Sequence, residues 1–361
     1  MADYDIGKAF EKIENELIAS MIRNMNGHKV EEVNEEKEWA MWQALQLESL
    51  EQYKRKNKDK YKAEFADMNA RIDEVIRECY AQGEMDQEIA ILEAIKKGFH
   101  PPVQSPGMTG QFFKLNERKL EALIAETAGN VKKAEVAILR MANDKYRKVI
   151  FDAQVYANTG AATYEKAVDM ATKDYLNAGI NCIEYKNGTR VSAATYASMA
   201  LRTANKRAYL QGEGNKRKEW GISTVIMNKR GTACRKCFKF QGKIFIDDVW
   251  SGGKASDGDY PLLSTAIAQG LYHPNCRDSH TTFFPGITKK PRALSKEEKE
   301  QSIAEYDQEQ KQNYVRHEKK RFARLAAGSL DGDNKKRYEH KCDEYKDTYS
   351  NITDDVKKEV Q

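Results

Sequence analysis

An apolar stripe with alternating spacings of four and three residues constrains the fold most. Its members are Tyr61, Phe65, Met68, Ile72, Val75 and Cys79. Residues at these spacings share one face of an α-helix, and the pattern is typical of a helix that packs along another helix. Because the stripe spans only about two heptads, it favours a helical hairpin or docking arm over a free-standing coiled coil. We therefore expect residues 1–99 to form a helical N-terminal arm.

Proline and glycine interrupt this helical region. The segment 98–110, GFHPPVQSPGMTG, holds three of the chain's seven prolines, and a helix cannot continue through it. We expect a linker over 100–110. Helical patterns resume near Leu115, with an expected break at Gly129, and they continue around Tyr164 to a predicted helix end at Gly179.

The first β-strand patterns appear near residue 180. INCIEY and TRVSA flank Asn187-Gly188, a dipeptide suited to a type I′ hairpin turn. The helical body, 111–192, is therefore expected to end in a β-hairpin, and Ser192 stands where a helix N-cap is expected. Further short strands are predicted at STVIMN and KIFIDD.

These patterns predict an α+β fold that is predominantly α-helical. Long N- and C-terminal helical arms are expected around a small β-containing module. The module spans 193–288, and the charged pattern of 289–361 predicts the C-terminal helical arm.

Composition excludes several classes of protein. The net charge of +5 excludes a polybasic protein. No stretch approaches the roughly 18 consecutive apolar residues that span a bilayer, and acidic residues occupy the N-terminus, where a secretory signal would be basic and then apolar. We expect a soluble protein that is made in a cytoplasm and has no membrane partner.

Two short motifs carry the chemistry that the sequence offers. They are Cys234-Arg-Lys-Cys237 and His273-Pro-Asn-Cys276. Zinc takes four sulfur or nitrogen ligands in a tetrahedron, and a two-residue gap lets one tight turn aim two ligands at the same ion. If the two turns meet, Cys234, Cys237, His273 and Cys276 form a closed Cys₃His set for a structural Zn²⁺.

Two other interpretations of these residues stay open. The cysteines are buried thiols and His273 is hydrogen-bonded in a core, or the cysteines pair in a disulfide. The absence of a secretory signal argues against a disulfide framework. We expect Cys79 and Cys182 to be small buried side chains, and Cys342 to be an incidental thiol in the charged tail.

Basic residues concentrate in 200–248, where 12 basic residues face 4 acidic ones, whereas residues 1–99 have a net charge of −7. A charge run is often only a solvated helix face. The functional interpretation is contact with phosphate or with an acidic protein surface. The candidate residues for nucleic-acid or partner binding are Arg202, Lys206, Arg207, Lys216, Arg217 and Lys218.

A series of motifs resembles the phage minor capsid protein 2 family, which is similar to the Mu F-like head morphogenesis proteins. The series runs from Tyr196 through Arg202-Thr203, Gly212, Trp220-Gly221-Ile222, Cys234-x-x-Cys237, Gly242-Lys243 and His273-Pro-Asn-Cys276-Arg277-Asp278 to Pro285-Gly286. The resemblance extends over about residues 116–325. The combination of CxxC with HPNCR is more specific than either half, and the module 193–288 is therefore described as Mu F-like.

The resemblance implies a low-copy structural protein of a tailed-phage head. Such a protein is internal to the capsid or lies at the portal vertex of the virion, and it acts in head assembly and in DNA packaging or delivery. The implied partners are the portal protein, other capsid proteins and viral DNA, with no small-molecule substrate. The family's Cys/His motif suggests metal binding at the four positions above, and no role transfers to residues 1–99.

Two alternatives to a structural head protein are considered. One is a zinc-containing nucleic-acid-binding protein, in which aromatic residues among the basic ones stack on bases. The other is a nuclease of the His-Asn-His type, with His280 as the catalytic candidate, although the paired residues expected ahead of it are missing. We therefore expect that the protein is not an enzyme.

Overall fold

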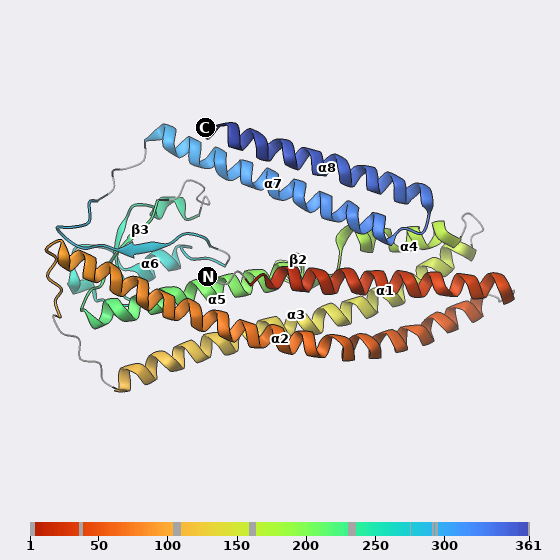
Figure 1. The fold of residues 1–361 in the computed structure, drawn as a ribbon, viewed down its shortest axis with the longest axis horizontal. Helices are drawn as coiled ribbons and strands as arrows, with labels where there is room; N and C mark the ends of the chain where they lie inside the picture. Colours follow the sequence, from red (N-terminus) through yellow and green to blue (C-terminus); the bar gives the residue numbers. More distant parts are fainter. Residues whose placement is uncertain are drawn as a thin grey trace. The chain divides into compact units, whose positions relative to one another are not determined.

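The computed structural model describes residues 4–35, 39–103, 110–158, 164–229, 236–274, 276–290, 292 and 295–359. Within these residues the chain forms mainly α-helices, with a few short β-strands (Figure 1). The predicted α+β, predominantly α-helical fold is confirmed. The chain divides into two compact units. Unit 1 consists of residues 1–4, 69–130 and 199–309, and unit 2 consists of residues 5–68, 131–198 and 310–361.

The helices are long compared with the strands. They are α1 (Ile6–Glu35), α2 (Trp39–Lys96), α3 (Gly110–Asn158), α4 (Tyr164–Ala178), α5 (Ala193–Glu219), α6 (Leu263–Ala268), α7 (Lys296–Gly328) and α8 (Gly332–Glu359). All six residues of the stripe from Tyr61 to Cys79 lie on α2 and are buried. The division into arms, linker, body and module that the sequence suggests remains a prediction.

The core of unit 2 is built from aromatic and aliphatic residues of its helices. Phe10, Leu17, Tyr53 and Tyr146 are all buried there. The Tyr53 hydroxyl donates a hydrogen bond to the Leu17 carbonyl at 3.0 Å. Its ring packs edge-on against Tyr146, with centroids 5.2 Å apart. The buried hydroxyl is therefore paired, as a polar group in a core must be.

Helix α4 ends at Gly179, as the sequence predicts. Gly179 has φ +68°, and its N–H donates to the Tyr175 carbonyl at 2.8 Å. Arg324 of α7 donates to the carbonyls of Leu176 and Asn177 at 3.2 and 3.3 Å. A cation at these unpaired carbonyls stabilises a helix C-terminus, so α7 is held against the end of α4.

The predicted hairpin forms, but its turn differs from the expected type. Strands β1 (Asn181–Glu184) and β2 (Arg190–Ser192) pair antiparallel. The Gly188 N–H donates to the Tyr185 carbonyl, and Gly188 alone in the turn has positive φ, at +79°. A type I′ turn needs positive φ at both central residues, so the turn is the three-residue kind with glycine last. Ser192 caps α5 as expected, since its Oγ accepts from the Thr195 N–H at 3.2 Å.

Unit 1 contains a three-stranded antiparallel sheet in the order β4-β3-β5. The strands are β3 (Thr224–Met227), β4 (Ile244–Ile246) and β5 (His280–Thr282). Strands β3 and β4 occupy the positions predicted at STVIMN and KIFIDD. Val225 is the central register position, opposite Phe245 on one side and Thr282 on the other. The sheet anchors the loops that carry the Cys/His residues.

The expected helix break at Gly129 is wrong. Helix α3 runs without interruption from Gly110 to Asn158. Glycine in a helix interior costs only about 1 kcal/mol relative to alanine, and the buried residues Ile124, Val131 and Ala134 on the flanking turns offset that cost. Among the helices that the structure describes, none combines the length and apolar character needed to cross a membrane.

Candidate metal centre

Two tight turns in unit 1 bring the Cys/His residues together. The Cys276 N–H donates to the His273 carbonyl at 2.9 Å, which folds the segment after α6 into a turn. The Phe240 N–H donates to the Cys237 carbonyl at 3.0 Å and forms the second turn, between β3 and β4. Both thiols pack into one hydrophobic cluster with Phe240 and Leu271. The core of the small module therefore positions the two sulfur atoms.

The donor atoms of Cys237, His273 and Cys276 lie within 4.8 Å of one another. The two Sγ atoms are 3.6 Å apart. Thiolates that bind one zinc at about 2.3 Å in a tetrahedron are separated by roughly 3.8 Å, so the sulfur spacing fits a shared ion. The His273 Nδ1 lies 2.9 Å from the Pro274 carbonyl oxygen and donates to it. That bond leaves the lone pair on Nε2, the arrangement common in metal-binding histidines.

The electrostatics of the cluster favour a thiolate. The pKa of Cys276 is lowered to about 7, chiefly by the hydrogen bond from Cys237 and then by the hydrogen bond from the Asp278 backbone N–H, while burial opposes the shift. A thiolate is the form of cysteine that binds metal. The described cysteines, Cys79, Cys182, Cys237, Cys276 and Cys342, are all free thiols. The donor set therefore fits Zn²⁺ or a similar ion, and the disulfide interpretation does not hold among these five.

The fourth predicted ligand, Cys234, lies outside the described residues, so the structure brings together three of the four. Asp278 is a neighbour that the sequence reasoning did not select. It is 4% exposed, and its Oδ2 lies 3.6 Å from the Cys276 Sγ. Its Oδ1 is buried without a hydrogen-bond partner among the described residues. Its place two residues after Cys276 in the motif was the only signal that pointed to it.

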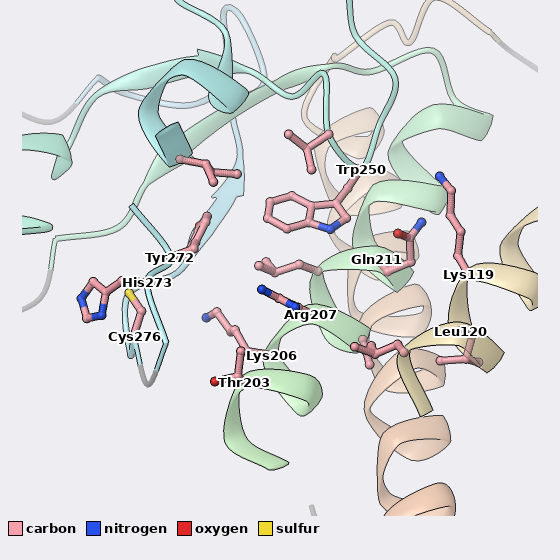
Figure 2. A pocket seen from close by; sticks show the side chains of 15 residues that line it. Lys119, Leu120, Thr203, Lys206, Arg207, Gln211, Trp250, Tyr272, His273 and Cys276 are labelled. Carbon is pink, nitrogen blue, oxygen red and sulfur yellow. The ribbon is translucent and has the colours of Figure 1, made fainter. Parts of the chain in front are cut away.

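The six candidate basic residues all lie on α5 but in different surroundings. Arg202, Arg207 and Lys218 are exposed, and Lys206 is half-buried. Lys206 and Arg207 line a pocket that also includes His273 and Cys276 (Figure 2). The Lys216 ammonium pairs with the carboxylates of Glu88 at 3.0 Å and Glu219 at 3.1 Å. Only part of the set is therefore available at the surface.

Arg217 is fully buried, with 0% of its side chain exposed. Its guanidinium donates to Asp247 Oδ2 at 3.0 Å and to Ser251 Oγ at 2.9 Å. A third bond, to Gln87 Oε1, is 3.3 Å long. The structure thus places Arg217 inside unit 1, where it links α5 to the segment after β4 rather than facing a phosphate.

His280 lies in the same buried network. Its Nδ1 is 2.7 Å from the Tyr272 hydroxyl, and its Nε2 is 3.1 Å from a nitrogen of Arg217. Burial, and then the charge of Arg217, lower the pKa of His280 to about 3. The imidazole is therefore neutral at neutral pH, and it is 2% exposed. This position does not suit the catalytic histidine of a nuclease, which must reach its substrate.

Comparison with models of protein families gives a match over nearly the whole chain. The family model described as "Phage minor capsid protein 2" matches residues 4–351. No curated protein and no solved structure matches the chain. The matched range includes the Cys/His turns and the buried network around Arg217.

Proposed function

Because the chain belongs to the phage minor capsid protein 2 family, we propose that this structural protein of the phage head is an internal or portal-associated component that acts in head assembly. The observation that carries the proposal is the length of the family match, which extends over residues 4–351. A match of that extent includes α1 to α7 and most of α8, as well as the Cys/His module. The portal protein and other capsid proteins are the proposed partners, and the virion is the proposed location.

An exposed apolar stripe on α2 supports a role in assembly. Met85, Ile89 and Leu92 are separated by four and three residues and are each about half exposed. Residues at that spacing lie on one helix face. Exposed apolar side chains in a row favour contact with another protein. We propose that a head protein covers this stripe in the assembled particle.

We propose that the Cys/His cluster holds a structural Zn²⁺, with Cys234 as the fourth ligand beside Cys237, His273 and Cys276. The convergence of three donor atoms within 4.8 Å supports this. A bound ion would hold two loops that otherwise rest on a small sheet, and it would supply cross-linking rather than catalysis. The buried position of His280 also supports a role without enzymatic activity.

The test is to follow the protein through phage assembly. An epitope-tagged copy replaces the gene in the phage genome, and particles are purified at each stage. We expect the tag in heads and mature virions at low copy, and cross-linking mass spectrometry is expected to join lysines of this chain to the portal protein. A tagged replication protein of the same phage serves as the control for trapped material. Absence of the tag from every class of particle contradicts the proposal.

A further inference from the structure

A pocket of about 330 Å³ opens in unit 1 beside the Cys/His cluster (Figure 2). Its walls come from α3, α5, α6 and the loops around the three-stranded sheet. Sites for small molecules have volumes of about 300–1,000 Å³, so this pocket has room for one small group. A nucleic-acid duplex or a folded partner does not fit into it.

The pocket is positively charged. Lys119, Lys206 and Arg207 are among its lining residues, and no Asp or Glu is. Figure 2 shows Lys206 and Arg207 pointing from α5 towards the side on which Tyr272 and His273 lie. The nearby buried Glu213 offsets only part of this charge, because burial raises its pKa to about 7. An anion is therefore the complementary ligand, and the two neighbouring cations on α5 suit phosphate.

The remaining lining is apolar and includes a fixed aromatic ring, that of Trp250. The backbone N–H of Trp250 donates to Asp247 Oδ1 at 2.9 Å, and the indole packs edge-on against Tyr272 with centroids 5.7 Å apart. Gly214 of α5 lets the Trp250 backbone approach, since a Cβ there would come closer than 3.0 Å to it. A rigid indole in a pocket wall favours a flat ligand group that can stack.

We propose that this pocket binds one nucleotide, with its phosphate at Lys206 and Arg207 and its base against Trp250, while Lys119 adds positive charge from the opposite wall (Figure 2). The ligand is either a free nucleotide or a nucleotide within single-stranded DNA, because both present the same phosphate and base. The proposal deepens the proposed function, on which its biological setting rests, by assigning the contact with DNA to a pocket rather than to the whole basic stretch of α5. An acidic aromatic peptide is the rival ligand.

Equilibrium binding by the full-length protein tests the proposal. The probe is fluorescein-labelled oligothymidylate, followed by anisotropy, and the competitors are thymidine monophosphate, thymidine and inorganic phosphate. We expect thymidine monophosphate to compete at least about tenfold better than thymidine or phosphate, because it alone offers both groups. Direct titration with thymidine monophosphate, followed by tryptophan fluorescence, detects binding of the free nucleotide when the oligonucleotide itself does not bind.

Matched variants locate the binding in the pocket. Arg207→Gln is expected to weaken binding about tenfold, since it removes a charge-assisted hydrogen bond. Lys119→Gln is expected to weaken binding to a smaller extent, since it removes only positive charge from the opposite wall. Arg118→Gln is the control, because Arg118 is the exposed neighbour of Lys119 on α3 and does not line the pocket. Trp250→Leu is expected to weaken binding about tenfold by loss of stacking. If Trp250→Leu does not fold, Arg207→Gln and the comparison of Lys119→Gln with Arg118→Gln still decide the test.

Each outcome supports or overturns the proposal. Binding of the oligonucleotide with competition by thymidine monophosphate supports a site for a strand, and binding of thymidine monophosphate alone supports a site for a free nucleotide. The proposal is overturned if neither binds, if Arg118→Gln weakens binding as much as Lys119→Gln, or if an acidic aromatic peptide binds and the nucleotide does not. Incorporation into virions is measured separately, so failure here is distinguishable from failure of the proposed function.

Discussion

Gly83 of α2 and Gly212 of α5 lie against each other where the two helices cross in unit 1. A Cβ at Gly83 would come closer than 3.0 Å to the Tyr209 carbonyl oxygen, and a Cβ at Gly212 would come as close to that of Tyr80. The two helix backbones are therefore in direct contact, with no side chain between them. This crossing fixes the position of α5, which carries Arg217 and forms one wall of the pocket.

We expect Gly212→Ala to destabilise the protein, because the added methyl group meets a backbone carbonyl that cannot move away. Overpacking of this kind costs about 1–3 kcal/mol, and unfolding in urea measures it. Gly129→Ala is the matched control, since Gly129 also lies inside a helix but has open space around its Cβ position. That substitution is expected to stabilise the protein by up to about 1 kcal/mol. Equal effects of the two substitutions would contradict a close crossing.

Removal of the Arg217 side chain is expected to destabilise the protein more than Gly212→Ala does. Arg217→Met leaves Asp247 buried without its cationic partner, and breaking a buried ion pair in this way costs about 3–5 kcal/mol. Chemical denaturation measures the loss. Lys218→Met, at the exposed neighbouring position, is expected to change stability by less than about 0.5 kcal/mol. A stable Arg217→Met protein with weakened binding of DNA would instead return Arg217 to the binding surface.

The buried His280 is expected to make the stability of the protein depend on pH. Its pKa is lowered by burial to about 3 in the folded protein, against about 6.5 in the unfolded chain. Between these values only the unfolded chain binds the proton, so stability falls as pH decreases from about 6.5 towards 3. The slope due to this one group is about 1.4 kcal/mol per pH unit.

The measurement compares urea unfolding of the wild-type protein and His280→Gln from pH 7 to pH 4.5. The free energy of unfolding of the variant is expected to fall less steeply with decreasing pH. The difference in slope corresponds to the uptake of about one proton, or about 1.4 kcal/mol per pH unit. Any loss of metal at low pH occurs in both proteins and cancels in the comparison. Parallel curves for the two proteins would show that His280 takes up its proton in the folded state.

Asp169 of α4 is expected to hold the turn between α7 and α8 in unit 2. Its carboxylate accepts from the Leu330 N–H at 2.7 Å and from the Asn334 side chain at 3.0 Å, and also from the Ser329 hydroxyl. Asp169→Ala removes the acceptor of these half-buried donors, so we expect a loss of about 1–3 kcal/mol. Faster hydrogen exchange at the start of α8 would report the release of the turn. Asp174→Ala, on an exposed face of the same helix, is expected to change neither quantity.

Local patterns in the sequence predict the elements whose structure is determined locally. The stripe from Tyr61 to Cys79 predicts a buried helix face because its period matches the helical repeat. Gly179 and Ser192 predict a helix end and a helix start because each residue type satisfies unpaired backbone groups there. The uninterrupted helix at Gly129 differs from prediction because buried residues on the flanking turns outweigh a small intrinsic preference. The turn at Asn187 differs because a glycine with positive φ also suits the last position of a three-residue turn.

The surroundings of the basic residues could not be predicted in this way. Lys216, Arg217 and Lys218 are adjacent in sequence, and successive residues of an α-helix point about 100° apart. They therefore face three directions, and the charge count alone does not distinguish them. Arg217 faces the interior, where its partner Asp247 is 30 residues away, and only the tertiary fold brings the two together.

In the metal centre too, the local sequence predicts one part of the structure and the tertiary fold determines the rest. Each ligand-x-x-ligand step is recognisable because one tight turn forms it, whereas the meeting of Cys237 with Cys276 depends on the sheet between them. Asp278 carries no such pattern. Its role beside the thiol depends on burial, which the sequence does not report.

Zinc analysis of the purified protein provides the last prediction. We expect about one equivalent of zinc per chain by mass spectrometry, and we expect Cys276→Ala to remove it and to lower the melting temperature, because metal binding contributes directly to folding. Cys342→Ala is the control, since Cys342 is a free thiol outside the cluster. In the cobalt-substituted protein, thiolate-to-cobalt absorption is expected and should decrease in Cys237→Ser. Zinc well below one equivalent in the wild-type protein, with unchanged stability in Cys276→Ala, would leave Cys237 and Cys276 as buried thiols that merely pack in the core.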